Sequence, residues 1–282
     1  MTILETSGWE DYELVDSGDG KRLERFGKYT LVRPDPQAIW KPMAEKSLWE
    51  KADAVFDKNW INKNNVPEKW LVKYKNLSLY LRLTPFKHTG MFPEQQINWE
   101  FIENKIKESK RGINVLNLFG YTGISTLVAA EAGAKVTHVD ASKPSITWLR
   151  ENQEASNLMD RPIRIIVDDA LKFTAREIKR GVKYDAVLMD PPVYGHDPKG
   201  RTWEFNKDFP QLMENVSQIL SPDPLFVIVN TYAISSSSIM LENVVNDYLG
   251  KLGGKVQIGE LALKEKTGGR LLSTGIFGRW EK

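Results

Sequence analysis

Cysteine is absent from the 282-residue chain. Its absence excludes disulfide bonds, thiolate metal sites and a cysteine nucleophile. Histidine is also scarce, because the chain has only His88, His138 and His196, which lie far apart in the sequence. This spacing argues against a histidine-rich metal centre, so we expect no bound metal. Long hydrophobic runs are missing as well. No stretch approaches the roughly 20 apolar residues of a membrane-spanning helix, and we expect no membrane partner.

The chain also has little net charge, because 39 basic residues and 37 acidic residues leave only +2. A nucleic-acid contact therefore has to come from a local basic patch rather than from the overall charge. The first twenty residues lack the basic-then-apolar order of a signal peptide, and we expect a cytoplasmic protein. With 41% hydrophobic residues the chain can bury a real core, and its length favours one large domain and a smaller one.

The first 85 residues differ in pattern from the rest. Short aromatic-rich runs over residues 12–42 are broken by SGDG, FGK and PDP, which is typical of small antiparallel strands. Five of the nine tryptophans lie in this region. We interpret them as core residues, with base stacking as the alternative. Residues 1–85 are thus expected to form a small β-rich domain.

From about residue 94 onward, predicted helices and strands alternate. The segments VLNLF, AVLMD and LFVIV are apolar on both faces, as in a parallel sheet that helices cover on both sides. Two final strand segments, KVQIGELAL and LLSTGIFGRW, close the chain with no helix between them. We expect residues 86–282 to form an α/β domain, with a doubly wound, mostly parallel sheet and a terminal hairpin.

Glycines and carboxylates follow the predicted strands, at the edge where a doubly wound sheet binds ligands. Gly120 and Gly123 follow the first strand and allow a sharp turn that a ligand can approach closely, although a tight strand-to-helix turn alone also explains them. Asp140 ends the second strand, 20 residues after Gly120, the separation expected for a carboxylate that binds a ribose. Asp168 and Asp169 end the third strand.

With Asp190 at the end of the fourth strand, four carboxylates stand at three successive strand ends. A pyrophosphate prefers helix N-termini with few nearby anions, so this acidic edge favours another kind of ligand. S-adenosylmethionine has a positive sulfonium, ribose hydroxyls and an adenine amine, which all suit carboxylates. Each aspartate alone has an alternative role, since aspartate commonly caps the following helix.

The segments FGYTG, HVDAS, VDDALKF and DPPVYG, in this order and spacing, resemble the class I S-adenosylmethionine-dependent methyltransferases. More narrowly, they resemble the branch that contains bacterial large-subunit (23S) ribosomal RNA methyltransferases. GKRLERFGKYTLVRPDPQAIW and HTGMFPEQ resemble upstream segments of that branch, so the resemblance covers most of the chain. It implies a Rossmann-like, seven-stranded sheet. We expect no PUA-type RNA-binding module, which is usual in that branch.

The resemblance also implies which residues surround the cofactor S-adenosylmethionine. The first motif, beside the methionine and sulfonium portion, is Phe119, Gly120, Tyr121, Thr122 and Gly123. The ribose would contact Asp140, Ala141 and Ser142, and the adenine would contact Asp169 and Ala170, or Asp168 if the register is shifted by one. Thr89, Phe92 and Gln95 belong to a segment that closes over the cofactor, and Asp190 of the catalytic segment is a further contact. Packing at a helix start is the alternative for Phe92.

The segment Asp190-Pro191-Pro192, with Tyr194 two residues further on, is interpreted as catalytic. Methyl transfer from a sulfonium is an in-line displacement with an activated leaving group, so the main task of the enzyme is alignment. The prolines stiffen the chain and remove two N–H donors, which leaves a carboxylate and carbonyl oxygens to accept from an exocyclic amine. Tyr194 is expected to stack on a base, with packing inside its loop as the alternative.

The missing cysteine restricts the acceptor. Related enzymes that methylate C5 of a pyrimidine carry a cysteine after the fifth strand, where this sequence reads NTYA at 230–233. Cysteine-dependent C5 chemistry is therefore excluded, and an amine, a ring nitrogen or a hydroxyl remains. The loop at 195–209 combines basic with aromatic residues, which favours RNA over a solvated lid, the alternative. These residues are His196, Lys199, Arg201, Trp203, Phe205 and Lys207. His196 is interpreted as a surface residue rather than a general base.

These observations predict a methyltransferase that modifies a base nitrogen or amine of ribosomal RNA. A methyltransferase for a protein or small molecule is the nearest alternative. A nicotinamide-dependent oxidoreductase is disfavoured because the full G-x-G-x-x-G is missing, and a non-catalytic cofactor-binding protein is a third class. Residues 1–85 are open to three roles, namely a substrate platform, the contact of a homodimer, or a cover for the sheet.

Overall fold

The computed structural model describes residues 1–196, 202–232 and 237–282. Within it the chain forms two compact units. The larger unit contains residues 1–3, 98–260 and 275–282, and the smaller unit contains residues 4–97 and 261–274. The smaller unit thus runs past residue 85 and includes a segment near the C-terminus. The division into domains at residue 85 stays a prediction.

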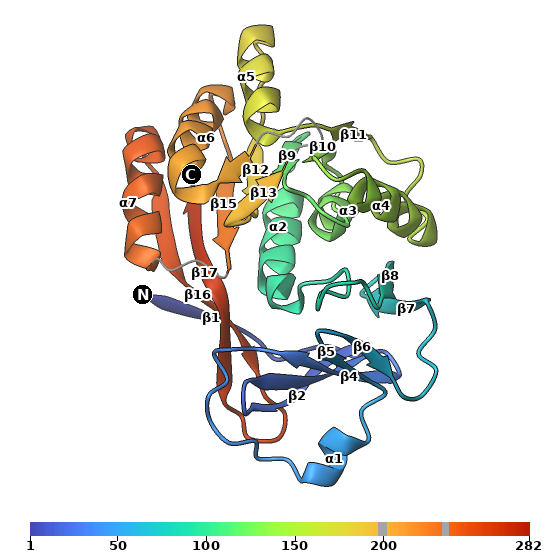
Figure 1. Cartoon of the computed structure of the whole chain (residues 1–282). Coiled ribbons are helices and arrows are strands. Elements are labelled where there is room, and N and C mark those ends of the chain that lie inside the picture. Colours follow the sequence, from blue (N-terminus) through green and yellow to red (C-terminus); the bar gives the residue numbers. More distant parts are fainter. Residues whose placement is uncertain (197–201, 233–236) are drawn as a thin grey trace. The chain divides into compact units, whose positions relative to one another are not determined.

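An eight-stranded sheet has the order β1-β16-β17-β15-β12-β9-β10-β11 (Figure 1). Its strands β9 to β12 and β15 belong to the larger unit, whereas β1, β16 and β17 have residues in both units. The five strands β11, β10, β9, β12 and β15 are parallel, and β17 runs antiparallel to β15. The strands are β1 (Thr2–Thr6), β9 (Asn114–Leu118), β10 (Lys135–Asp140), β11 (Ile163–Val167), β12 (Ala186–Met189), β15 (Phe226–Thr231), β16 (Lys255–Lys264) and β17 (Leu271–Glu281). The expected doubly wound, mostly parallel sheet is confirmed. The eighth strand, β1, was not expected, because its short sequence has no continuous apolar run.

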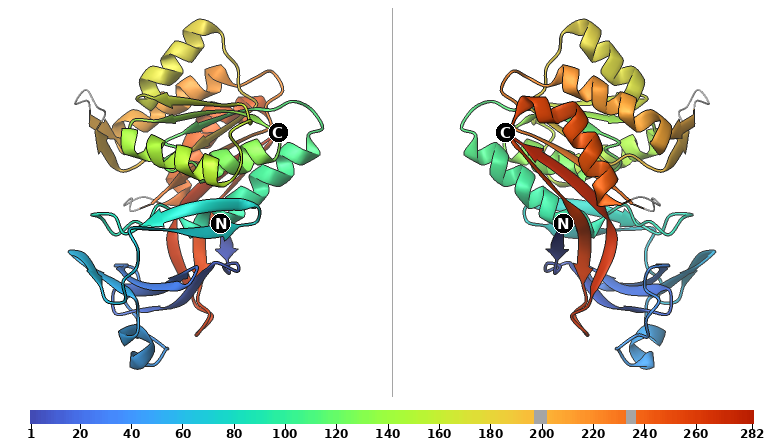
Figure 2. Two further views of the ribbon diagram at one scale, coloured as in Figure 1. Left: turned by 90° about the vertical axis from the view of Figure 1, so that its right-hand side faces the viewer. Right: turned by 90° about the vertical axis from the view of Figure 1, so that its left-hand side faces the viewer.

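Helices cover both faces of this sheet. In Figures 1 and 2, α3 and α4 lie on one face and α6 and α7 on the other, and α5 packs against α6. The helices are α2 (Gln96–Glu108), α3 (Ile124–Glu131), α4 (Lys143–Ala155), α5 (Ala170–Arg180), α6 (Phe205–Ile219) and α7 (Ser238–Leu249), followed by the short 3-10 helix η2 (Gly250–Leu252). Within the described residues, no helix is long and apolar enough to span a bilayer.

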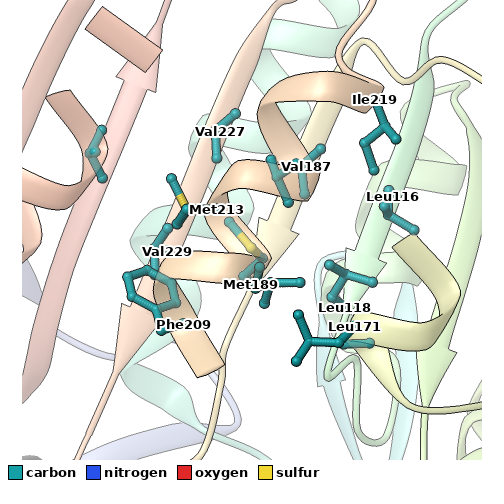
Figure 3. Packing of buried hydrophobic residues seen from close by; sticks show 14 of the residues in the cluster. Leu116, Leu118, Leu171, Val187, Met189, Phe209, Met213, Ile219, Val227 and Val229 are labelled. Carbon is teal, nitrogen blue, oxygen red and sulfur yellow. The ribbon is translucent and has the colours of Figure 1, made fainter. Parts of the chain in front are cut away.

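The central strands are buried on both faces, as their apolar sequences predict. Every residue of β12 and β15 is buried. Figure 3 shows the side chains of these strands packed against α6, with Phe209 and Met213 between the helix and the sheet. This packing holds the carboxyl ends of β12 and β15 in register with β9, so the loops after these strands begin from a rigid edge.

The smaller unit is β-rich, as expected. Its five-stranded sheet has the order β2-β3-β4-β5-β6, and β7 and β8 form a separate hairpin. The strands are β2 (Tyr12–Gly18), β3 (Lys21–Phe26), β4 (Tyr29–Pro34), β5 (Ala54–Asp57), β6 (Asn59–Asn62), β7 (Lys69–Tyr74) and β8 (Leu77–Arg82), with the helix α1 (Lys46–Glu50) and the 3-10 helix η1 (Pro93–Gln95).

The five tryptophans of this unit have structural partners. Trp70 is buried, whereas the other four are partly buried. Each indole N–H donates a hydrogen bond inside the unit, as in the bonds from Trp9 to the Lys73 carbonyl at 2.7 Å and from Trp49 to the Asp16 carboxylate at 3.0 Å. These bonds favour a packing role for the indoles over base stacking.

A buried ion-pair cluster holds the sheet of the smaller unit together. Glu24 on β3 accepts from the guanidinium of Arg33 at 2.7 and 2.8 Å and from the hydroxyl of Tyr12 at 2.9 Å. Arg22 lies 3.3 Å from the same carboxylate. Burial alone would raise the pKa of Glu24, but Arg22 and Arg33 bring it below its ordinary value of 4.5. Glu24 is therefore ionised at neutral pH.

Replacing Glu24 by alanine should lower the free energy of unfolding by about 3–5 kcal/mol, because Arg33 would remain buried without its counter-charge. The matched control is Glu50→Ala, which removes an exposed carboxylate that pairs with Lys46 and should cost about 0–1 kcal/mol. Urea denaturation measures both. Since the pKa of Glu24 is lowered in the folded state, its contribution should be present above pH 4.5 and decrease as the pH falls further. Equal losses in the two variants would contradict this role.

Candidate active site

The turn after β9 has an unusual backbone. Phe119 and Tyr121 have positive φ angles of 56° and 52°, and Gly123 has a φ of 84°. Non-glycine residues rarely adopt this left-handed region, and such residues cluster at ligand sites. The turn is held by hydrogen bonds from the Gly120 N–H to the Val139 carbonyl at 3.2 Å and from the Gly123 N–H to the Gly120 carbonyl at 2.9 Å.

Both glycines of the turn are required by local packing. A Cβ atom on Gly120 would lie 2.3 Å from Cε1 of His138, and one on Gly123 would lie 1.9 Å from Cδ1 of Leu149. Neither space accepts a methyl group without displacing its neighbour. The tight strand-to-helix turn thus accounts for both glycines, independently of any ligand.

Asp140 connects this turn to the loop after β10. One carboxylate oxygen accepts from the Tyr121 N–H and the other from the Ser142 N–H, both at 2.8 Å. Ala141 lies between them in the sequence, and the Ser142 hydroxyl oxygen caps α4 by accepting from the Ser145 N–H at 3.3 Å. Burial raises the pKa of Asp140 above its ordinary value, although both backbone donors act to lower it.

The carboxylates after β11 both have partners in the protein. Asp169 caps α5, since its side chain accepts from the Lys172 N–H at 2.8 Å, and Ala170 is the first residue of that helix. Asp168 forms an ion pair with Arg176, and its N–H donates to the Asp140 carbonyl at 3.1 Å. The helix-cap alternative is thus realised for Asp169. The backbone bond places the β11 loop next to the β10 loop.

The Asp-Pro-Pro segment leaves the sheet between two neighbouring loops. Met189, the last residue of β12, pairs with Leu118 of β9 and with Val229 of β15, so Asp190 follows at the same edge. The indole N–H of Trp203 donates to the Pro192 carbonyl at 2.7 Å, and its ring packs 5.0 Å from that of Phe119. The segment is therefore fixed to the turn after β9.

The described residues of the segment expected to be a loop at 195–209, namely 195–196 and 202–209, belong to strands and a helix. Tyr194 begins the short strand β13 (Tyr194–His196), which pairs with β14 (Thr202–Glu204), and α6 starts at Phe205. The aromatic side chains of Trp203 and Phe205 are buried in the core. They cannot stack on bases, which corrects that interpretation. The side chain of Tyr194 is 69% exposed.

Of the basic residues expected in this loop, Lys207 is exposed on α6. Lys199, Arg201 and the side chain of His196 lie outside the described residues. The RNA contact expected from these basic residues stays a prediction.

One polar chain at this edge was missed by the sequence reasoning. Nη2 of Arg279 donates to Oδ1 of Asn98 at 2.6 Å, and Nδ2 of Asn98 donates to Oδ1 of Asn230 at 3.0 Å. All three residues are buried, and burial lowers the pKa of Arg279 to about 10. Asn230 follows Val229, the partner of Met189, so this chain orients an amide beside Asp190. Its residues stand in three separate elements, and no spacing in the sequence connects them.

The segment expected to close over the cofactor belongs to the smaller unit. Thr89 is fully buried, and its carbonyl accepts from the Arg82 N–H at 3.1 Å. Phe92 precedes η1 and Gln95 is its last residue, and the Phe92 carbonyl accepts from the Gln95 N–H at 3.0 Å. Phe92 thus stands at a helix start. The cofactor contacts of these three residues stay predictions.

Among the residues that the structure describes, no group of three or more histidine, aspartate or glutamate side chains is arranged to hold a metal ion.

Comparison with known proteins identifies the family. A family model for an S-adenosylmethionine-dependent methyltransferase matches residues 50–249. Among curated proteins, "Ribosomal RNA large subunit methyltransferase K/L" of Shewanella frigidimarina is 29% identical over 167 residues, which cover 58% of this chain and 22% of that protein. The protein of the same name from Pseudoalteromonas atlantica is 30% identical over 190 residues, covering 66% of this chain and 26% of its own length. The chain thus spans about a quarter of these relatives.

Among solved structures, a SAM-dependent methyltransferase from Agrobacterium tumefaciens aligns with a TM-score of 0.97 and 41% sequence identity. The alignment covers 100% of this chain and 93% of that one. Similarity over the whole length means that both units of this chain, not only the sheet with the glycine turn, have counterparts in that methyltransferase.

Replacing Gly120 by alanine should destabilise the fold by about 1–3 kcal/mol, because the added methyl group overlaps the His138 ring. Gly112→Ala is the matched control, since no atom lies within 4 Å of the added Cβ atom. Chemical denaturation measures both variants. In a His138→Ala background, the penalty of Gly120→Ala should shrink, and a double-mutant cycle measures this coupling. If Gly120→Ala costs the same free energy of unfolding with and without the His138 ring, the overlap with that ring is not the cause of the loss.

Proposed function

The chain belongs to the S-adenosylmethionine-dependent methyltransferases, and we propose that its acceptor is ribosomal RNA of the large subunit, methylated at a base nitrogen or amine. The observation that carries methyl transfer is the edge where the glycine turn, Asp140 and the Asp190 segment follow the adjacent strands β9, β10 and β12. The RNA acceptor is supported by the curated relatives, which are named ribosomal RNA methyltransferases.

The residues of this edge fit S-adenosylmethionine by their chemistry. Four carboxylates follow the strands β10, β11 and β12, of which β12 is separated from β10 by β9, and they suit a ligand with a positive sulfonium, hydroxyls and an amine. Asp140 uses two acceptor positions for backbone N–H groups, and a carboxylate offers about four. It can therefore also accept from ribose hydroxyls, while Asp169 and Asp168 border the adenine side. When bound, the cofactor supplies an activated methyl group.

The Asp-Pro-Pro segment orients the acceptor. Pro191 and Pro192 have no N–H, and the Pro192 carbonyl already accepts from Trp203. An exocyclic amine of the acceptor would therefore donate to the Asp190 carboxylate or to the carbonyls of Asp190 and Pro191. Such bonds would aim the lone pair of the nitrogen, and the exposed ring of Tyr194 would stack on the base, a contact worth about 1–3 kcal/mol.

A protein or small-molecule acceptor is the second candidate. Two observations favour it, namely the net charge of only +2 and the burial of Trp203 and Phe205, which removes two aromatic groups expected to contact RNA.

The first experiment measures transfer of a tritiated methyl group from S-adenosylmethionine to RNA, protein and small-molecule fractions. These fractions should come from a strain that lacks the protein. We expect label in large-subunit ribosomal RNA, and mapping of the label identifies the modified base. Label only in protein or in small molecules would overturn the RNA assignment and keep the enzyme class.

Asp190→Ala should reduce the rate of methyl transfer by about 10²-fold or more, because the acceptor loses an orienting contact. Asp223→Ala is the control, as this carboxylate is 81% exposed and remote from the carboxyl edge by its place before β15. Single-turnover labelling measures both variants. Full methyl transfer by the Asp190→Ala variant would contradict a catalytic role for Asp190.

Asp140→Asn should weaken cofactor binding by about 10- to 100-fold, the effect of losing a charged hydrogen-bond acceptor. Isothermal titration calorimetry with S-adenosylmethionine measures the affinity, with Asp160→Asn, an exposed carboxylate, as the control. Because burial raises the pKa of Asp140, the affinity of the unmodified protein should fall as the pH decreases through that raised pKa, since the protonated form accepts less well. An affinity that is unchanged by the substitution would contradict the ribose assignment.

A further inference from the structure

Three buried polar side chains surround the glycine turn on three different elements. Asn117 lies on β9 just before the turn, Thr126 lies on α3 just after it, and His138 lies on β10. Nδ2 of Asn117 is 2.9 Å from Oγ1 of Thr126, and Oγ1 of Thr126 is 2.9 Å from Nδ1 of His138. Asn117 and His138 lie inside the segments VLNLF and HVDAS, but none of the three side chains was assigned a role at the site.

The direction of these hydrogen bonds determines where the imidazole carries its proton. The amide of Asn117 donates, so the Thr126 oxygen accepts and has one proton of its own to give. Donation of that proton to Nδ1 of His138, 2.9 Å away, places the ring proton on Nε2, and this is the tautomer that the relay proposed below requires. The ring is fully buried, and burial lowers the pKa of His138 to about 3, so it is neutral at physiological pH. Among the described residues, Nε2 has no hydrogen-bond partner. The hydroxyl of Thr126 is thus the group that fixes the ring orientation.

The imidazole ring of His138, held in this orientation, packs directly against the turn at Gly120. Its Nδ1–Cε1 edge faces Gly120 so closely that a methyl group on Gly120 would meet both atoms within 2.5 Å. Gly120 lies between Phe119 and Tyr121, the two residues with left-handed backbone. That conformation persists only where the surroundings enforce it. A rotated or displaced ring would remove the surface on which the turn rests.

We propose that Asn117, Thr126 and His138 form a positioning relay that holds the 119–123 turn in its cofactor-binding conformation, with His138 as the positioning residue. The relay connects the three elements β9, α3 and β10, which carry the turn and lead to Asp140. The inference rests on the proposed placement of S-adenosylmethionine beside this turn.

The test compares Thr126→Val with Thr126→Ser. Valine keeps the size of threonine and removes the hydroxyl, whereas serine keeps the hydroxyl. Thr147→Val is the matched control, because the Thr147 hydroxyl bonds only to the Lys143 carbonyl on the exposed side of α4. We expect the Kd for S-adenosylmethionine to rise at least about tenfold in Thr126→Val, the effect of leaving buried donors and acceptors unpaired. It should stay within about twofold in Thr126→Ser and Thr147→Val.

A spectroscopic measurement on the cofactor-free protein separates positioning from general stability. With three histidines in the chain, ¹⁵N NMR of the imidazoles can be assigned by comparison with His138→Gln. The unmodified protein and Thr126→Ser should show the Nε2–H tautomer for His138. Thr126→Val should lose this single state but remain folded, with a melting temperature several degrees below that of Thr126→Ser because buried groups lose their partner. If Thr126→Val fails to fold, the Asn117→Ala variant takes its place in both measurements. An Nδ1–H tautomer in the unmodified protein would overturn the relay.

The Asp140→Asn variant distinguishes failure of the relay from failure of the proposed site. If Asp140→Asn weakens binding and Thr126→Val does not, the relay is wrong and the cofactor placement stands. If neither variant weakens binding, the placement of the cofactor beside this turn is wrong, and the relay proposal is overturned with it.

Discussion

The carboxylate of Asp140 is the contact on which the geometry of the candidate site depends. One of its oxygens holds the turn after β9 and the other holds the loop that enters α4, through the N–H groups of Tyr121 and Ser142. The backbone carbonyl of the same residue receives the N–H of Asp168. A single residue thus joins the loops after three neighbouring strands. Burial of such a carboxylate is costly unless it is hydrogen-bonded, and the two donors offset that cost.

This arrangement explains how the turn tolerates two left-handed residues. The positive φ of Tyr121 brings its N–H to Asp140, and that of Phe119 accompanies the packing of its ring on Trp203. The His138 ring fills the space beside Gly120 that a side chain would otherwise occupy. The strain of the turn is therefore balanced by a hydrogen bond, a ring contact and close packing at separate points. A site built in this way is formed before any ligand binds, which reduces the ordering cost of binding.

The sequence predicted those parts of the molecule that depend on local pattern. Apolar runs indicated the parallel strands. The 20-residue separation of Gly120 and Asp140 predicted that both lie at one edge of the sheet, where Asp140 accepts from the N–H of Tyr121, next to Gly120. It could not predict contacts set by register and tertiary packing. His138, Thr126 and Asn117 look like isolated polar residues in apolar segments, and their bonds exist only because β9, β10 and α3 meet. The sequence around Trp203 and Phe205 resembles an exposed loop of basic and aromatic residues. In the structure Trp203 lies on β14 and Phe205 begins α6, and both rings are in the core.

The burial of these two rings changes how an acceptor would be recognised. With Trp203 committed to Phe119 and to the Pro192 carbonyl, the Asp-Pro-Pro segment is a rigid strip of acceptors joined to the glycine turn. If the acceptor is the one proposed, these groups would select a substrate that donates, such as an exocyclic amine, and discriminate against a carbonyl at the same position, which would leave their oxygens unpaired. Tyr194 follows this strip with an exposed ring, and in the proposed function it would stack on the base. Because Trp203 contacts both the turn and the strip, a displacement of the turn would be transmitted to the acceptor side, and alignment of donor and acceptor would depend on one packed aromatic pair.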